Sequence, residues 1–347
     1  MPIPVLDLFA CAGGFSWGFE FESERFQVKL AIEKVKQHTQ TYAKNFPDTD
    51  VVCADILDIS GEWIVSRMGH PFIVIGGPPC QSFSMQGKRS KSDPRLQLIY
   101  EFKRVVCEVE APYFLLENVE GLVWGDMKLV FDDLCQQFTE SGYTVAYKVL
   151  DAADYGIPQR RRRVFLMGCR PGYTLPKFPE PRGRVTVAEA LADLPVVERH
   201  PELFLIDALP YSCLSEPVSE YSELMRSSPP EQLTGLMRSR HEPPLIAKYI
   251  ATEPGQREPT SHCPKLRPDD VAPTLLGGSL GARNTALRPI HYEYPRVLLK
   301  REGARLQSFP DNFIFADTML HAWNQIGNAV PPMIARYFAQ EFDRALT

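Results

Sequence analysis

A cysteine stands where an apolar segment gives way to a rigid turn. Residues 72–77, FIVIGG, are typical of a buried strand, and Pro78 and Pro79 separate them from Cys80. Glycines let the backbone approach a ligand, prolines stiffen the turn, and α/β sheets bind ligands at the carboxyl ends of their strands. Most free cysteines are buried structural residues. Here the surroundings favour a nucleophile that is presented to a substrate.

A carboxylic acid follows a second apolar segment. The run YFLLENV at 113–119 predicts a strand that ends at Glu117 and Asn118, at the same sheet edge as Cys80. Burial beside a ligand would raise the pKa of Glu117 and let it hold and deliver a proton near neutral pH. A surface or helix-capping carboxylate is the alternative.

Four consecutive arginines, residues 160–163, lead into the apolar run 163–169. Side chains alternate along a strand, so Arg161 and Arg163 are expected on one face. A solvated charge run is the ordinary interpretation. Next to an apolar strand, however, inward-facing guanidinium groups need a partner such as a phosphate or a polarised carbonyl.

These residues need a sheet to position them. Apolar runs alternate with helix-like segments up to about residue 170, which predicts a doubly wound, Rossmann-like α/β sheet. We expect strands at 5–9, 27–33, 50–56, 72–77, 113–119, 144–150 and 163–169, and helices at 35–46, from 95 onward, and ending at 142.

The amino-acid composition changes after Cys169. Prolines and basic residues at 170–184 indicate a linker, and the proline-rich stretch to about residue 290 predicts a smaller, irregular domain. Pro331 and Pro332 suit the start of a last helix, whose apolar face should pack on the first domain.

Composition narrows the class of protein. Hydrophobic residues make up 44% and charged residues 23% of 347 residues, values that favour an ordered globular chain. The sequence shows no membrane-length apolar run and no secretory leader at its start, so a cytoplasmic protein is expected. The eight scattered cysteines lack metal-site spacing, which disfavours disulfides and bound metal.

Taken in order, the motifs resemble those of the cytosine-5 DNA methyltransferases. They are DLFACAGGF, Glu33, the Asp55 of CADI, PPCQSFS, ENV, QRRRR, REGARLQSFPDNF and QIGNAVPP. The resemblance spans nearly the whole chain. It implies the S-adenosylmethionine-dependent methyltransferase fold, with a catalytic domain at 1–174, a target recognition domain at 175–290, and a return to the catalytic domain at 291–347.

The resemblance also implies the chemistry. A cytosine is flipped out of duplex DNA, the Cys80 thiolate adds to carbon-6, and Glu117 protonates nitrogen-3. Carbon-5 then takes the methyl group of S-adenosylmethionine, which leaves as S-adenosylhomocysteine, and loss of the carbon-5 proton expels the cysteine. Arg163 and Arg161 would contact the carbonyl of the base.

In this family the cofactor is held at strand ends, with Glu33 on the ribose hydroxyls and Asp55 on the adenine amino group. The cofactor-binding residues implied are Phe9, Gly13, Gly14, Glu33, Asp55, Ile56, Pro79, Leu98 and Asn328. Cys11 departs from the glycine that is usual at its position. If the backbone there needs a positive φ, the cofactor loop is strained.

DNA contact is expected despite a net charge of −5, because the basic residues are clustered. The DNA-binding residues proposed are Ser84, Gln86, Lys88, Arg89, Arg95, Arg160, Arg238, Arg240 and Arg283. Any single recognition arginine could instead pair with an acid of its own domain. The acidic stretch at 189–231 is expected to face away from DNA.

The leading interpretation is a bacterial DNA methyltransferase, a monomer that acts on double-stranded DNA alongside a restriction endonuclease. Methylation of transfer RNA is one alternative, which the sizeable variable domain disfavours. A non-catalytic accessory protein on the same fold is another, although such a protein could have lost Cys80 or Glu117, and both are present.

Overall fold

The computed structural model describes residues 2–347 apart from 22–23, 80–96 and 278–287. Contacts between Cα atoms divide the chain into two compact units. The first comprises Met1–Asp151, Arg162–Glu180 and Pro332–Thr347, and the second comprises Ala152–Arg161 and Pro181–Pro331.

A mostly parallel sheet forms the centre of the first unit. Within the described residues it has seven strands in the order β3-β2-β1-β4-β5-β7-β6, and β7 runs antiparallel to both neighbours. The bounds are β1 Ile3–Leu8, β2 Phe26–Glu33, β3 Asp50–Cys53, β4 Ile73–Gly76, β5 Tyr113–Val119, β6 Thr144–Asp151 and β7 Arg162–Cys169. All seven predicted strands are confirmed.

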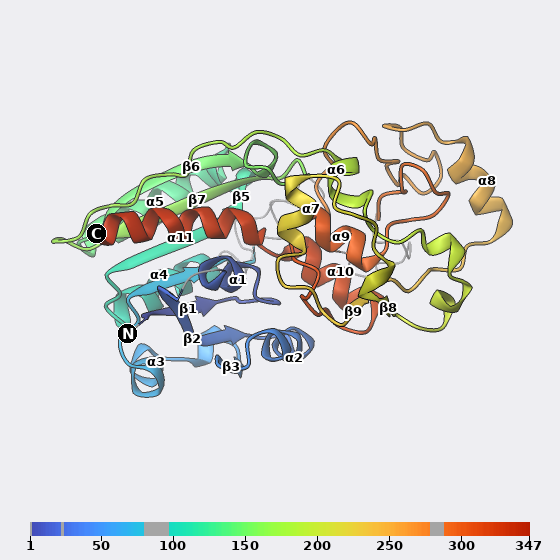
Figure 1. The fold of residues 1–347 in the computed structure, drawn as a ribbon. Coiled ribbons are helices and arrows are strands. Elements are labelled where there is room, and N and C mark those ends of the chain that lie inside the picture. The colour runs from blue at the N-terminus through green and yellow to red at the C-terminus, as the bar shows by residue number, and fades with distance from the viewer. Residues whose placement is uncertain (1, 22–23, 80–96, 278–287) are drawn as a thin grey trace. The chain divides into compact units, whose positions relative to one another are not determined.

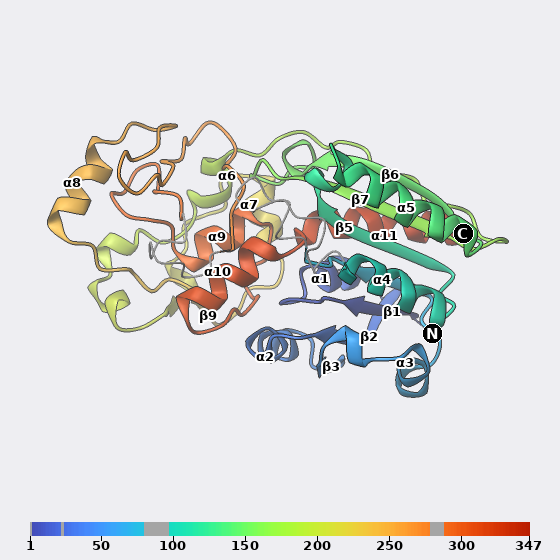
Figure 2. The ribbon, with the colours of Figure 1, turned by 180° about the vertical axis from the view of Figure 1, so that it is seen from behind.

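Helices cover both faces of this sheet, which confirms the doubly wound class. Helices α1 and α11 pack together on one face, while α3, α4 and α5 follow one another on the other face (Figures 1 and 2). The bounds are α1 Gly14–Glu20, α2 Lys36–Asn45, α3 Gly61–Met68, α4 Gln97–Glu108, α5 Met127–Glu140 and α11 Pro332–Leu346.

The apolar core of the first unit lies between the sheet and its helices. On one side Phe114 of β5 stacks on Phe138 of α5, with the ring centroids 4.0 Å apart. On the other side the predicted last helix, α11, buries Ile334, Phe338 and Phe342. This packing on α1 and the sheet confirms the expectation that the last helix returns to the first part of the chain.

The second unit is rich in loops, as its prolines predict. Its described elements are short: α6 Val187–Leu191, β8 Ala208–Pro210, α7 Glu220–Met225, β9 Gln232–Thr234, α8 Pro243–Ala251, α9 Lys300–Leu306 and α10 Met319–Asn328. Buried ion pairs hold them together. Arg305, which is fully buried, binds Asp311 at 2.6 Å and Asp193 at 3.1 Å.

Three acids of the stretch at 189–231 form ion pairs within the second unit, and the expectation that the stretch faces away from DNA stays a prediction. Asp193 is fully buried against Arg305, and Glu198 binds Arg296 at 2.8 Å. Asp207 likewise accepts a bond from Lys300 at 2.7 Å. A buried charge requires a partner, and the basic residues at 296–305 supply one for each of these acids.

By contacts the chain re-enters the first unit at Pro332, whereas the sequence prediction placed the return at 291. The functional division into catalytic (1–174 and 291–347) and target recognition (175–290) domains stays a prediction. Among the helices that the structure describes, none combines the length and the apolar character needed to cross a membrane.

Candidate active site

The predicted site residues of the first unit gather at one edge of its sheet. Strand register brings the ends of β1, β2 and β3 together, since Leu8 pairs with Ile32 and Glu33 pairs with Cys53. Leu8 also pairs with Gly76 at the end of β4. The loops that follow these parallel strands therefore share one edge, which is where such sheets bind ligands.

The loop after β1 is held in a left-handed conformation. Phe9, Cys11 and Gly13 have φ values of 58°, 49° and 97°. A Cβ atom at Gly13 would collide with the ring of Phe46, so the close approach of this loop to α2 requires glycine. Cys11 occupies a conformation that costs a non-glycine residue about 1–2 kcal/mol. The positive φ at Cys11, on which the expected strain of the cofactor loop depends, is therefore present.

Glu33, at the end of β2, fixes that loop. One carboxylate oxygen accepts the backbone N–H of Cys11 at 2.9 Å, and the other accepts that of Val35 at 2.8 Å. His38 lies 3.7 Å from the second oxygen. Burial lowers the pKa of His38, but hydrogen bonds with Cys11 and Glu33 outweigh burial and raise it to about 10. A cation is thus buried beside the Glu33 carboxylate at neutral pH.

Asp55 begins the short 3-10 turn Ile56–Asp58, accepting the N–H of Leu57 at 3.2 Å. It also pairs with the exposed Lys34, which lowers the pKa of Asp55. Arg104 of α4 binds the backbone of the same turn. One guanidinium nitrogen donates to the carbonyls of Ile56 and Ile59, each at 3.0 Å.

The turn after β4 is tied to the end of β5. The side-chain amide of Asn118 donates to the carbonyl of Pro78 at 3.2 Å, and both residues are buried. Pro79 is exposed, and Leu98 on α4 is half-buried. Cys80 lies outside the described residues, and so do Ser84, Gln86, Lys88, Arg89, Arg95 and Arg283.

Glu117 and Arg163 meet across β5 and β7. Glu117 pairs with Phe165 in the antiparallel register, which places Arg163, two residues earlier, diagonally opposite on the same face. Arg163 Nε lies 3.0 Å from Glu117 Oε1, an ion pair without the alignment of a hydrogen bond. Their side chains are 16% and 9% exposed, so solvent screens this pair only weakly. Burial lowers the pKa of Arg163, which Glu117 partly offsets.

Arg161 precedes β7 and is used within the second unit. It is buried, and its guanidinium donates to the carbonyls of Gly327 at 2.9 Å and Ala329 at 3.0 Å. These carbonyls flank Asn328, which is exposed. The bonds give Arg161 a structural use at the end of α10, and its predicted role toward a substrate stays a prediction.

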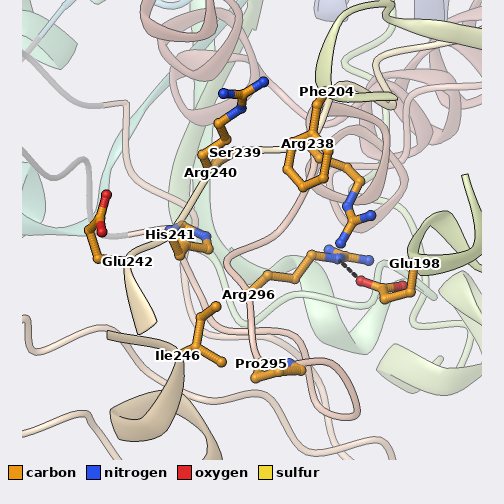
Figure 3. Close-up of a pocket in the computed structure, with 10 residues that line it drawn as sticks. All are labelled: Glu198, Phe204, Arg238, Ser239, Arg240, His241, Glu242, Ile246, Pro295 and Arg296. Carbon is orange, nitrogen blue, oxygen red and sulfur yellow. Dashed lines mark hydrogen bonds and ion pairs between the residues drawn. The ribbon is translucent and has the colours of Figure 1, made fainter. Parts of the chain in front are cut away.

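Three of the proposed DNA-binding arginines lie in described parts of the second unit. Arg160 and Arg240 are exposed and Arg238 is half-buried. Arg238 and Arg240 line a cavity together with Phe204 and His241 (Figure 3). Their contact with DNA stays a prediction.

The sequence reasoning did not single out His38, Arg104 or Asn118. Asn118 was named only as the neighbour of Glu117. Arg104 stands three residues after Glu101 and four before Glu108, a spacing that predicts an ordinary helix-surface ion pair and conceals the bonds to the adjacent turn. A histidine five residues after Glu33 gives no comparable signal, because the intervening turn sets their distance.

Comparison with known proteins gives concordant results. A family model described as C-5 cytosine-specific DNA methylase matches residues 3–344. The chain is 39% identical over 362 residues to the type II methyltransferase M.XorII of Xanthomonas oryzae pv. oryzae, covering 98% of this chain and 84% of that protein. It is 33% identical to the type II methyltransferase M.DdeI of Desulfomicrobium norvegicum, covering 97% and 87%.

Solved structures of methyltransferases also resemble this chain. A protein described as a DNA modification methyltransferase encoded within an E. coli prophage superposes with a TM-score of 0.84 at 28% identity, covering 99% of each chain. The Entamoeba histolytica methyltransferase EhMeth shares the fold, with a TM-score of 0.67 at 16% identity over 100% of this chain and 99% of that one.

Proposed function

Because the chain belongs to the C-5 cytosine-specific DNA methylase family, we propose that it is a catalytically complete DNA (cytosine-5-)-methyltransferase that works through a Cys80 adduct. The family implies S-adenosylmethionine as the methyl donor. The roles of individual residues extend that assignment to the chemistry of this chain.

The first unit offers a site of suitable chemistry for that cofactor. Gly13 lets the loop after β1 adopt a positive φ at the sheet edge, and Glu33 presents a carboxylate at the end of β2, where dinucleotide-type folds bind a ribose. Asp55 and Ile56 begin a turn at the end of β3 that suits an adenine. When bound, S-adenosylmethionine supplies the methyl group as an electrophile. Phe9, Gly14, Pro79 and Leu98 are the other first-unit residues proposed for this site, and Asn328, which the family resemblance also implies, belongs to the second unit.

Glu117 and Arg163 supply the acid–base and electrostatic parts of the proposed reaction. Cys80 adds as thiolate to carbon-6 of the cytosine, while Glu117 holds a proton at nitrogen-3 and so neutralises the ring as the adduct forms. Arg163, 3.0 Å from Glu117, would bind the neighbouring carbonyl oxygen and fix the carboxyl group. Loss of the carbon-5 proton then releases Cys80.

The observation that carries this proposal is the buried Glu117–Arg163 pair at the sheet edge, joined through Asn118 to the turn that precedes Cys80. An accessory protein has no need of such a pair. Bisulfite sequencing of DNA from cells that express the protein tests the proposal. We expect 5-methylcytosine in one short sequence context, and DNA without new methylation would refute it. RNA from the same cells tests the transfer RNA alternative.

The relatives of this chain are type II methyltransferases, so we propose a cognate restriction endonuclease as functional partner and double-stranded DNA as substrate. A cytoplasmic, monomeric enzyme fits this role.

Replacing Cys11 by glycine should tighten binding of S-adenosylmethionine by up to about fivefold, or about 1 kcal/mol. Glycine adopts the observed φ of 49° without strain, so the loop that donates to Glu33 is populated more fully. Isothermal titration calorimetry measures the change. Cys11→Ala is the matched control, because it removes the thiol that contacts His38 but keeps the Cβ atom. Equal tightening in both variants, or weaker binding by the glycine variant, would contradict relief of backbone strain.

Replacing Arg104 by alanine should weaken S-adenosylmethionine binding about three- to tenfold. The change leaves the carbonyls of Ile56 and Ile59 without their guanidinium donor, which loosens the turn proposed for adenine. Arg67→Ala is a matched control, since Arg67 is also an ion-paired arginine but binds the exposed Asp50. The dissociation constant for S-adenosylmethionine should rise in Arg104→Ala and should match that of the parent in Arg67→Ala. The affinity for DNA without cofactor should be unchanged in both variants. Equal cofactor affinity in all three proteins would exclude this positioning role.

A further inference from the structure

A cavity of about 490 Å³ is lined by residues of the second unit alone (Figure 3). This is within the range of about 300–1,000 Å³ that is typical of small-ligand sites. Its lining combines three arginines, a histidine and two glutamates with apolar side chains. The lining residues are Glu198, Phe204, Arg238, Ser239, Arg240, His241, Glu242, Ile246, Pro295 and Arg296.

Three buried polar atoms of this lining have no hydrogen-bond partner among the described residues. They are Arg238 Nε, His241 Nε2 and Glu198 Oε2. Leaving a buried donor or acceptor unpaired costs about 1–3 kcal/mol each, so a group that offers both acceptors and donors would be favoured at this cavity. Burial and the nearby Arg288 and Arg296 lower the pKa of His241, so its ring is neutral at neutral pH.

The groups that carry these atoms are held in place before a ligand binds. The Arg238 guanidinium lies over the ring of Phe204, 4.4 Å from its centroid, and Arg240 lies over the same ring at 5.6 Å. Arg296 donates to Glu198 Oε1 at 2.8 Å, and the other oxygen of Glu198 has no partner among the described residues. In Figure 3 Arg238 points toward the end of the cavity where Arg296 binds Glu198, whereas Arg240 points away.

The lining of this cavity, with cationic, carboxylate and apolar side chains together, suits a nucleobase better than a phosphate. A phosphate offers only acceptors, so it could satisfy Arg238 but not Glu198 Oε2, and it gains nothing from Phe204, Ile246 and Pro295. A guanine presents the acceptors O6 and N7, which arginine binds in bidentate fashion. A carboxylate then accepts from the N4 amino group of the paired cytosine, which lies beside O6 in the major groove.

We propose that this cavity is a guanine-recognition subsite, in which Arg238 binds O6 and N7 of one guanine in the methylated sequence and Glu198 accepts from the N4 amino group of the paired cytosine. The inference rests on the proposed function, because it takes the target DNA as the source of the base.

The test begins with the sequence context that the full-length protein methylates. Each guanine of that duplex is replaced in turn by 7-deazaguanine, which lacks the N7 acceptor, and dissociation constants are measured by fluorescence anisotropy. In the parent protein, one replacement should weaken binding about tenfold, within the about 1–3 kcal/mol of a bidentate contact. Arg238→Ala should bind the natural duplex about tenfold more weakly and lose its sensitivity at that guanine only.

Two further variants keep the result interpretable. Arg238→Lys keeps the charge without the bidentate geometry, so it should also lose the sensitivity while the salt dependence of binding is unchanged. Arg257→Ala removes an exposed arginine outside the cavity lining and should remain as sensitive as the parent. A 2-aminopurine placed beside the sensitive guanine tests the pairing: quenched fluorescence supports a guanine that is read in the groove beside its cytosine, and bright fluorescence, which indicates an unstacked guanine, contradicts it.

The proposal is overturned if Arg238→Ala keeps the sensitivity of the parent at every guanine. It is also overturned if Arg238→Ala merely reduces the slope of log Kd against log salt by about one, the signature of a phosphate contact. Absence of methylation at any sequence would refute the proposed function itself, whereas methylation without this coupling would refute only the guanine subsite.

Discussion

Duplex DNA that carries 5-fluorocytosine at the methylated position should form a denaturant-resistant complex with the parent protein when S-adenosylmethionine is present. A carbon-6 adduct is released only when the carbon-5 proton leaves, and fluorine cannot leave in that way. The crosslinked peptide should contain Cys80. Cys80→Ser should form no complex and should methylate at least about a thousandfold more slowly, because an alcohol is far less ionised than a thiol near neutral pH.

DNA affinity separates loss of chemistry from loss of folding in this experiment. Cys80→Ser leaves the basic residues proposed to contact DNA unchanged, so its dissociation constant for the unmodified duplex should match that of the parent. Cys53→Ser is a matched control, since Cys53 is an exposed cysteine at the end of β3, and it should crosslink normally. A crosslink that maps to another cysteine, or methylation by Cys80→Ser at the parent rate, would show that Cys80 is not the nucleophile.

The sequence predicts the strands of the first unit well because each is a short apolar run bounded by polar or turn residues, a local pattern that survives folding. It also places Glu33, Asp55 and Glu117 at one sheet edge, since carboxyl ends of parallel strands coincide. Strand order is a different matter. β7 lies between β5 and β6, antiparallel to both, and only this arrangement brings Arg163 diagonally opposite Glu117.

Residues that act through long-range contacts are hard to predict, because a local sequence pattern does not show which distant residues the fold brings together. The sequence placed Arg161 and Arg163 on one face, yet Arg161 precedes β7 and binds backbone carbonyls of the second unit. Asp193 and Glu198 belong to an acidic stretch whose neighbours in sequence offer no sign of their partners, which lie about a hundred residues later in the chain. Charge patterning describes neighbours in sequence, whereas burial pairs charges across the fold.

Glu117→Gln and Arg163→Ala should each lower the single-turnover rate of methyl transfer by about a hundredfold or more, and together by little more than the larger single loss. Glutamine cannot deliver a proton to nitrogen-3, and general acid catalysis contributes about 10²–10⁴-fold. Arg163→Ala removes the only described cation within 4 Å of Glu117 and one proposed ligand of the base carbonyl. If the two residues act on the ring as one unit, the second substitution has little left to remove.

The rates are measured at saturating cofactor and DNA, with dissociation constants for both determined separately, so that binding and chemistry are not confused. Arg162→Ala is the matched control, because it removes the neighbouring exposed guanidinium, which pairs with Glu120 at 2.8 Å, and it should change the rate less than about threefold. Losses that multiply in the double variant would mean that Glu117 and Arg163 act independently. In that case the 3.0 Å ion pair would organise the sheet edge rather than the protonation of cytosine.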